Sequence, residues 1–108
     1  MLSKKNRAGK RDVDLLFKRG KSIASPNLNF KFTLNHNSVS PRISFVAPKS
    51  VAKLAVNRNL LRRRGYDALK KHIYKFPASL FGVFVFKKYQ DDISILENEI
   101  KNILNQIH

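Results

Sequence analysis

The alternation of apolar and polar residues is clearest between residues 28 and 34. The apolar set is Leu28, Phe30, Phe32 and Leu34, and the polar set between them is Asn29, Lys31 and Thr33. A period of two residues places successive side chains on opposite faces of a strand. The pattern therefore predicts a strand with one buried face.

Three further stretches have the composition of strands. Residues 42–47 fit a strand that ends before Pro48. The first part of residues 80–89 is apolar on both faces, which is typical of a central strand. Residues 21–24 allow one more short strand. Together these stretches predict a sheet of four strands.

Three stretches have helical patterns. Residues 11–20 fit a short helix with two acidic residues in its first turn and a glycine at its end. Residues 51–74 fit a long helix, and residues 91–108 fit an amphipathic one. The apolar stripe of this last helix consists of Ile93, Leu96, Ile100, Ile103 and Ile107.

The order of these elements predicts an α+β fold. We expect a small two-layer α/β sandwich, in which a mostly antiparallel four-stranded sheet is covered by three helices. A chain of 108 residues is enough for one domain and too short for two. Residues 1–108 are therefore interpreted as one domain, with residues 1–10 as a basic, flexible arm.

The formal net charge of the chain is +15, which indicates the kind of partner that it binds. Residues 91–108 hold four of the seven acidic residues and one of the 22 basic ones, so the excess lies in the rest. Self-repulsion of this size opposes compaction, and a polyanionic partner is the usual reason to tolerate it. The chain has no cysteine and no apolar run long enough to span a bilayer, so we expect a cytoplasmic protein without a membrane partner.

The positive charge is densest in residues 56–72, where four Arg and two Lys accompany one acid, Asp67. At 100° per residue, the side expected to pack inward holds Leu61, Gly65, Ala68, Leu69 and His72. A continuous stripe beside it holds Asn59, Arg63, Tyr66 and Lys70. The remaining cations, Arg58, Arg62, Arg64 and Lys71, lie around the rest of the helix.

Arginine suits a nucleic-acid partner better than lysine does. Its planar guanidinium binds phosphate through two parallel hydrogen bonds and stacks on bases. Four arginines next to Asn59 and Tyr66 therefore favour a helix that binds nucleic acid. The same residues also fit a solvated basic face without a partner.

The sequence offers little for catalysis by the protein itself. His36, His72 and His108 are predicted in a loop, in a helix and at the terminus. Most acidic residues lie in the last helix, and no glycine-rich phosphate loop is present. We therefore expect no catalytic residue and no metal site on this chain.

The segment RISFVAPKSVAKLAVNRNLLRRRGYDAL, residues 42–69, resembles the signature of the bacterial ribonuclease P protein subunit. The matching positions are Pro48-Lys49-Ser50 in the turn, Val51-Ala52-Lys53 in the next step, the pair Ala55-Val56, Arg58 and Asn59 in the basic core, and the pair Arg62-Arg63. The segments VDLLFKRGKSI, NLNFKFTL and FGVFVFKK are similar to the family's first helix, second strand and last strand, in that order.

The chain departs from the family's pattern at three points. Leu60 occupies the third core position, which is usually Arg, and Tyr66 replaces a basic residue. Leu54 has the place of an insertion ahead of the core, and Arg64 supplies a charge one turn further on. The match and the charge together give the candidate RNA-binding residues Lys49, Lys53, Arg58, Asn59, Arg62, Arg63, Arg64, Tyr66 and Lys70.

The resemblance implies the protein subunit of an RNA-based endonuclease. This enzyme removes the 5′ leader of precursor tRNA, and its RNA subunit holds the catalytic Mg²⁺ ions. The implied partners are ribonuclease P RNA and precursor tRNA, and the implied chemistry needs no protein active site. The implied fold is similar to the second domain of a small-subunit ribosomal protein, with a left-handed crossover.

In this family a cleft between the sheet and the first helix holds the leader. A single strand of variable sequence is held well by aromatic side chains beside a cationic track. The candidates are Phe17, Phe30, Lys31 and Phe32, of which Phe17 and Phe32 match the family's cleft positions. For each phenylalanine, the alternative is a place in the core.

Three other classes of protein compete with this interpretation. Composition alone fits a small ribosomal or other structural RNA-binding protein, which the Arg-Asn motif and the order of elements disfavour. The stretch FGVFVF loosely resembles an RNA-recognition motif, but Ser79-Leu80 stand where that motif begins with a basic residue and glycine. A DNA-binding helix–turn–helix is disfavoured by the strands on both sides of the basic helix.

Overall fold

The computed structural model describes residues 18, 20–34 and 40–107. The predicted arm and nearly all of the helix predicted over residues 11–20 lie outside this part of the chain. The elements in chain order are β1 (Lys21–Ala24), β2 (Leu28–Thr33), β3 (Arg42–Val46), α2 (Ala55–Leu69), the short 3-10 helix η2 (Ile73–Lys75), β4 (Phe81–Phe86) and α3 (Ile93–Asn105).

The four strands form one sheet in the order β1–β2–β4–β3. The pairs β1–β2 and β2–β4 are antiparallel, and β3–β4 is parallel. The last strand in the chain, β4, therefore lies inside the sheet, as its two apolar faces require. The predicted four-stranded, mostly antiparallel sheet is confirmed, including the short strand over residues 21–24.

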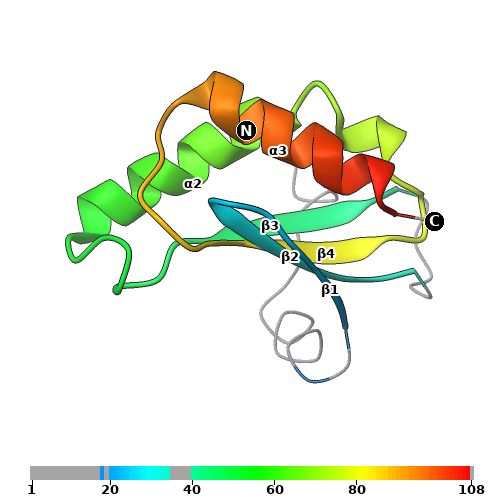
Figure 1. Ribbon diagram of the computed structural model, residues 1–108, viewed down its shortest axis with the longest axis horizontal. Helices are drawn as coiled ribbons and strands as arrows, with labels where there is room; N and C mark the ends of the chain where they lie inside the picture. Colours follow the sequence, from blue (N-terminus) through cyan, green and yellow to red (C-terminus); the bar gives the residue numbers. More distant parts are fainter. Residues whose placement is uncertain (1–17, 19, 35–39, 108) are drawn as a thin grey trace.

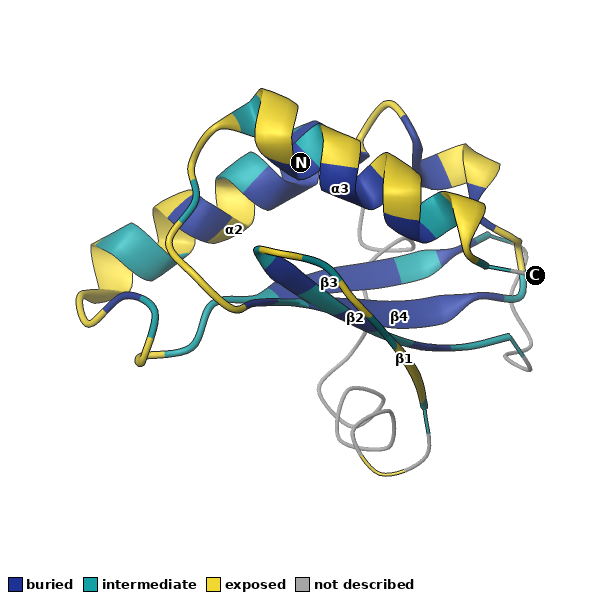
Figure 2. Ribbon diagram, viewed as in Figure 1, coloured by how far each residue is buried: buried dark blue, intermediate teal, exposed yellow. Residues whose placement is uncertain are grey.

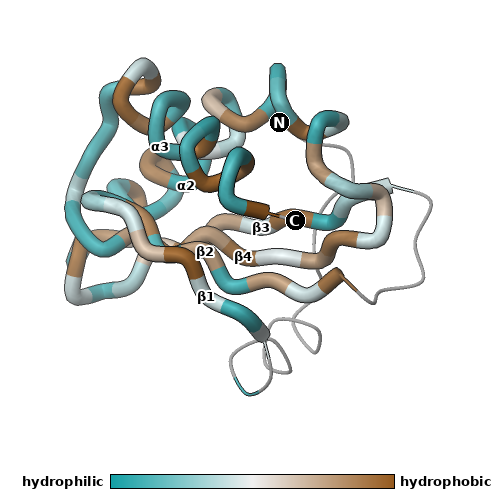
Figure 3. The backbone as a smooth tube through the Cα atoms, turned by 45° about the vertical axis from the view of Figure 1, so that its right-hand side comes forward, coloured by the Kyte–Doolittle hydropathy of each residue, from teal (hydrophilic) through white to brown (hydrophobic). Residues whose placement is uncertain are grey.

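The helices α2 and α3 lie side by side over one face of this sheet, which gives the predicted two layers (Figure 1). Buried residues of both helices face the sheet, and exposed residues face away from it (Figure 2). The hydropathy along the chain follows the same division, with hydrophobic residues in the central strands and hydrophilic ones on the outer turns of the helices (Figure 3).

A row of phenylalanines forms the centre of the core between the two layers. Phe30, Phe84 and Phe45 pair across three neighbouring strands, and the ring centroids lie 4.3 and 4.9 Å apart. Two glycines make room for these rings. A Cβ atom at Gly82 would meet the Phe30 ring at 2.5 Å, and one at Gly65 would meet the Phe45 ring at 2.5 Å.

The opposite face of the sheet carries a second, smaller apolar cluster. Phe81 and Val83 of β4 are buried there, and Val46 and Val85 pack against them. Because alternate residues of a strand point to opposite faces, β4 contributes apolar side chains to both clusters. This arrangement confirms the prediction of an interior strand over this stretch.

The helix predicted over residues 51–74 is shorter than expected at both ends. The backbone N–H groups of Val51 and Ala52 donate to the Pro48 carbonyl in a turn, and Leu54 has an extended backbone. After Leu69 the chain continues through a turn into η2. Both turns contain buried residues, so the apolar pattern in the sequence continues beyond the two ends of the helix and made the predicted helix too long.

The last helix, α3, follows its predicted pattern. Oδ1 of Asp92 accepts hydrogen bonds from the backbone N–H groups of Ser94 and Ile95, at 2.9 and 3.4 Å, and so caps the helix. In the apolar stripe, Leu96, Ile100 and Ile103 are fully buried, and Ile93 and Ile107 are half-buried. Within the described ranges, no helix combines the length and hydrophobicity needed to cross a membrane.

Candidate nucleic-acid interface

The basic helix α2 is fixed to the core by the side that its sequence predicts. Leu61, Gly65, Ala68 and Leu69 are buried, and so is His72 just beyond the helix end. α2 also packs beside α3 and over β3. The opposite side of α2 therefore faces outward, where charged side chains can meet a partner without disturbing the fold.

Most of the predicted RNA-binding residues lie on this outer side or in the loop before it. Lys49, Lys53, Asn59, Arg62, Arg63 and Lys70 are exposed, and Arg58 and Arg64 are half-buried. Asp67 is the one acidic residue of α2. A rigid helix thus presents a group of cations of the kind that binds a phosphate backbone.

Arg58 also has a role inside the protein. Its Nη1 donates to the carbonyl oxygens of Ala52 at 3.1 Å and Lys53 at 2.6 Å. These carbonyls belong to the turn that leads into α2, where the N-cap residue Leu54 offers no side-chain hydrogen bond. Arg58 therefore fixes the position of this turn relative to the helix.

The position predicted for Tyr66 on the outer stripe is wrong. Its side chain is 7% exposed, and its ring packs edge-on against Phe45 with centroids 5.0 Å apart. The backbone N–H of Phe45 donates to the Tyr66 hydroxyl at 3.2 Å. Because β3 is at the edge of the sheet, this hydroxyl satisfies a backbone donor that lacks a neighbouring strand.

Phe30 and Phe32 belong to the core, so their predicted place in the leader cleft is wrong. Phe30 is fully buried and Phe32 is 5% exposed, with ring centroids 5.3 Å apart on the side covered by α2 and α3. Lys31 is half-buried on the other face, where it pairs with Val83 of β4. Phe17 lies outside the described residues.

The face with Lys31 also carries a residue that the sequence pattern does not single out. Arg42 of β3 is half-buried and pairs with Phe81 of β4, two residues from Val83. Lys31 and Arg42 therefore place two cations on the same face, two strands apart. That these two cations share a face depends on the order and register of the strands, which cannot be predicted from the periodicity of one strand.

An exposed apolar pair on α2 is also absent from the predicted site. Val56 and Leu60 are 63% and 38% exposed, and Leu54 before them is 62% exposed. A spacing of four residues places Val56 and Leu60 on one face of the helix, opposite the buried Gly65 and Leu61. The helical wheel could have found this pair, because both residues fall outside the packed side.

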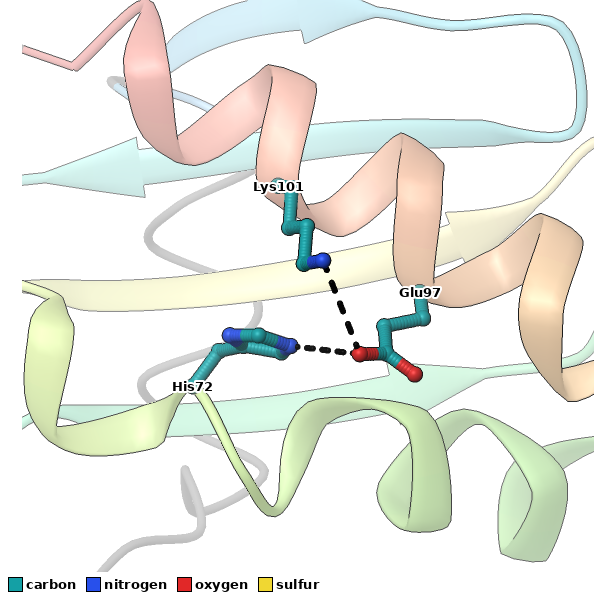
Figure 4. Close-up of polar contacts among 3 residues, drawn as sticks. All are labelled: His72, Glu97 and Lys101. Carbon is teal, nitrogen blue, oxygen red and sulfur yellow. Dashed lines mark hydrogen bonds and ion pairs between the residues drawn. The ribbon is translucent and has the colours of Figure 1, made fainter.

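A hydrogen bond between His72 and Glu97 joins the turn after α2 to α3. Nε2 of His72 lies 2.9 Å from Oε1 of Glu97, and Nζ of Lys101 lies 3.9 Å from the same oxygen (Figure 4). The hydrogen bond from His72, with the positive charges of Lys101 and Lys71, lowers the pKa of Glu97 against the opposing effect of desolvation. In the described part of the chain, no three His, Asp or Glu residues gather as a metal site would need.

Comparison with known proteins connects this geometry to a family. The sequence profile described as Ribonuclease P matches residues 2–108. The chain belongs to the Ribonuclease P family. Its function is that of the protein subunit of ribonuclease P, with ribonuclease P RNA as partner in tRNA processing. No match is found among curated proteins.

Solved structures of RNase P proteins have the same fold. The protein from Thermotoga maritima is 24% identical, with a TM-score of 0.80 over 94% of this chain and 97% of that one. The protein from Staphylococcus aureus is 18% identical, with a TM-score of 0.76 over 91% of this chain and 90% of that one. The α+β fold with a four-stranded sheet is therefore the fold of RNase P proteins.

Two of the three expected departures from the Ribonuclease P signature, Tyr66 and Leu60, differ in their surroundings. Tyr66, in place of a basic residue, is part of the core, whereas Leu60, in place of Arg, is at the surface. Tyr66 contributes packing against Phe45 and no charge. At Leu60 an apolar side chain stands among the cations of the outer face.

Proposed function

We propose that the outer face of α2 is the surface by which this chain binds ribonuclease P RNA. The observation that carries the proposal is the contrast between the two sides of the helix. One side is buried against the sheet, the opposite side exposes Arg63 and Lys70, and Arg62 is exposed beside the buried side. Neutralising phosphates with a preformed helix releases counterions without ordering a flexible segment.

We infer that the catalytic centre of the endonuclease lies in the RNA subunit. Mg²⁺ prefers oxygen ligands and is usually held by phosphates and water, while the exposed side of α2 repels cations. Mg²⁺ is then bound by the RNA and the substrate. The protein's contribution is to neutralise phosphates that would otherwise need a higher concentration of Mg²⁺.

We propose that the 5′ leader of precursor tRNA runs along the face of the sheet opposite α2 and α3. Lys31 and Arg42 both lie on this face, where they can contact phosphates of a single strand. Phe17 remains a candidate for an aromatic contact. This assignment replaces the cleft first predicted around Phe30 and Phe32.

The cellular setting and the topology complete the proposal. We place the protein in the cytoplasm, where a chain without cysteine suits a reducing environment. The parallel pair β3–β4 is joined through α2, and we propose the left-handed crossover that the second domain of a small-subunit ribosomal protein also has.

Cleavage of precursor tRNA at low Mg²⁺ tests the proposed function. The ribonuclease P RNA of the same organism is assayed with and without the protein, after confirming that the RNA alone cleaves at high Mg²⁺. We expect the protein to restore cleavage at low Mg²⁺. An RNA whose Mg²⁺ requirement is the same with and without the protein would contradict the proposal.

A further inference from the structure

The outer side of α2 is not uniformly polar. Val56 and Leu60, which we call the apolar crest, are 63% and 38% exposed on the side away from the core. They are one turn apart, so their side chains can form one continuous apolar surface. The fold does not need them there, because the opposite side of the helix supplies its buried contacts.

Cations surround the apolar crest. Arg63 and Arg64 follow Leu60 by three and four residues, within the next turn, and Lys53 precedes Val56 in the exposed turn. The ligand that fits this surface must offer negative charges around an uncharged, partly apolar centre. A second copy of this chain does not fit, because it would bring two faces of like charge together.

RNA has this combination of groups. Its phosphates lie on either side of the ribose rings. In an A-form helix the wide, shallow minor groove leaves ribose groups and the edges of the bases accessible. Resting on the proposed function, we propose that the apolar crest packs against ribose and base edges of ribonuclease P RNA while Arg63 and Arg64 bind the flanking phosphates.

The proposal makes a prediction that separates apolar from ionic binding. Removal of a phosphate contact lowers affinity and reduces the slope of log K against log salt by about one unit. Loss of an apolar contact lowers affinity by a similar factor at every salt concentration. The fold-change caused by loss of the crest should therefore be the same at low and at high salt, whereas the ionic contribution weakens as the salt concentration rises.

The test measures the dissociation constant for folded ribonuclease P RNA across a series of salt concentrations. The variant is Val56→Thr combined with Leu60→Gln, which keeps side-chain size close to that of the wild type. The control is Ile95→Gln on α3, because Ile95 is 40% exposed, close to the value for Leu60. Circular dichroism and Tm establish that each variant is folded, and Leu60→Ala gives a second, smaller change.

We expect the double variant to bind about tenfold more weakly at all salt concentrations, with the wild-type slope, and Ile95→Gln to bind as the wild type does. Unchanged affinity, or a weaker affinity with a reduced slope, would overturn the proposal. Sedimentation without RNA tests the other occupant, since a wild-type dimer that the double variant dissociates would assign the crest to a second copy. If the wild type itself binds this RNA without a steep salt slope, the proposed function fails instead.

Discussion

Arg58 and Arg63 belong to the same helix, but the structure gives them different surroundings. Arg58 is half-buried and donates to two carbonyls of the turn before α2, whereas Arg63 is exposed. A single substitution at each position should therefore have different effects on folding and on RNA binding. The resemblance to the family predicts RNA binding for both arginines and does not predict that Arg58 also stabilises the turn before α2.

We expect Arg58→Ala to lower both stability and RNA affinity. Loss of the two hydrogen bonds leaves the carbonyls of Ala52 and Lys53 without this donor, at a cost of about 1–2 kcal/mol. Arg63→Ala should leave Tm unchanged and reduce the salt slope of binding by about one unit. Chemical denaturation and salt-dependent binding measure the two effects, and equal Tm values for both variants would contradict the difference in roles.

The second prediction at this scale concerns Phe32. Its burial on the helix-covered face means that Phe32→Ala should destabilise the fold by about 3–5 kcal/mol. The folded fraction should lose affinity equally for precursor and mature tRNA, with Phe32→Leu as a milder control. A stable variant that loses only its preference for precursor tRNA would return Phe32 to the leader site.

The errors at Tyr66 and Phe32 have a common cause. A large aromatic residue serves equally well as a base-stacking surface and as a core residue. The alternation in β2 predicts that Phe30 and Phe32 share a face, and this is confirmed. Which face the helices cover depends on contacts distant in sequence, so the periodicity could not decide between core and cleft.

At the scale of elements, Glu99 joins α3 to the turn between β1 and β2. Its carboxylate accepts hydrogen bonds from the Ser25 hydroxyl at 2.5 Å, the Asn27 backbone N–H at 2.8 Å and the Asn27 side-chain amide at 2.5 Å. The side chain is 6% exposed. Three donors satisfy a buried carboxylate that would be costly to leave alone.

Glu99→Gln should weaken the contact between α3 and the turn between β1 and β2. A glutamine amide places an NH₂ group where the carboxylate accepts hydrogen bonds, so at least one of the three donors loses its acceptor, and we expect a loss of about 1–3 kcal/mol. Hydrogen exchange should increase at Asn27 and in β1, while amides of α2 keep their protection. Glu97→Gln, on the same helix but with a different partner, is the matched control; equal effects on β1 would contradict a specific role for Glu99.

A second contact between elements makes stability depend on pH. Because His72, Lys101 and Lys71 lower the pKa of Glu97 below its ordinary value of 4.5, the folded state binds this proton less readily than the unfolded state. Its stabilising contribution is therefore complete above about pH 4.5 and disappears as the pH falls through the lower folded pKa.

We expect the Tm of the wild type to fall more steeply than that of Glu97→Gln as the pH drops from about 5 to about 3. Thermal unfolding at a series of pH values measures the two slopes, with Asp91→Asn as the control for an exposed acid. Parallel curves for the wild type and Glu97→Gln would show that the contact contributes nothing to acid sensitivity.

The elements themselves were the most predictable part of the fold. β2 and α3 follow from period-two and period-3.6 patterns, because each buries one regular face, and β4 follows from its continuous apolar run. The limits of α2 were not predictable in the same way. Arg58 fixes the turn before the helix, and His72 packs into the core from the turn after it. Because both turns contain buried residues, periodicity cannot distinguish them from the helix. The contact between Glu99 and Ser25 is likewise invisible in the sequence, since it joins residues 74 positions apart.

At the scale of the whole molecule, the question is whether RNA binding depends on net charge or on its location. A net charge of +15 attracts any polyanion, so composition predicts the class of partner but not the surface. The structure separates the two, because Arg62, Arg63 and Lys70 are exposed on one helix, α2, whereas Lys75, Lys88 and Lys101 are exposed elsewhere.

Two triple variants with the same net charge provide the decisive comparison. One replaces Arg62, Arg63 and Lys70 of α2 by Gln, and the other replaces Lys75, Lys88 and Lys101 by Gln. We expect the α2 variant to reduce the salt slope for ribonuclease P RNA by about three units and the other by less than about one. Equal reductions would mean that the charge of the whole molecule, and not the outer face of α2, determines how the protein binds its RNA.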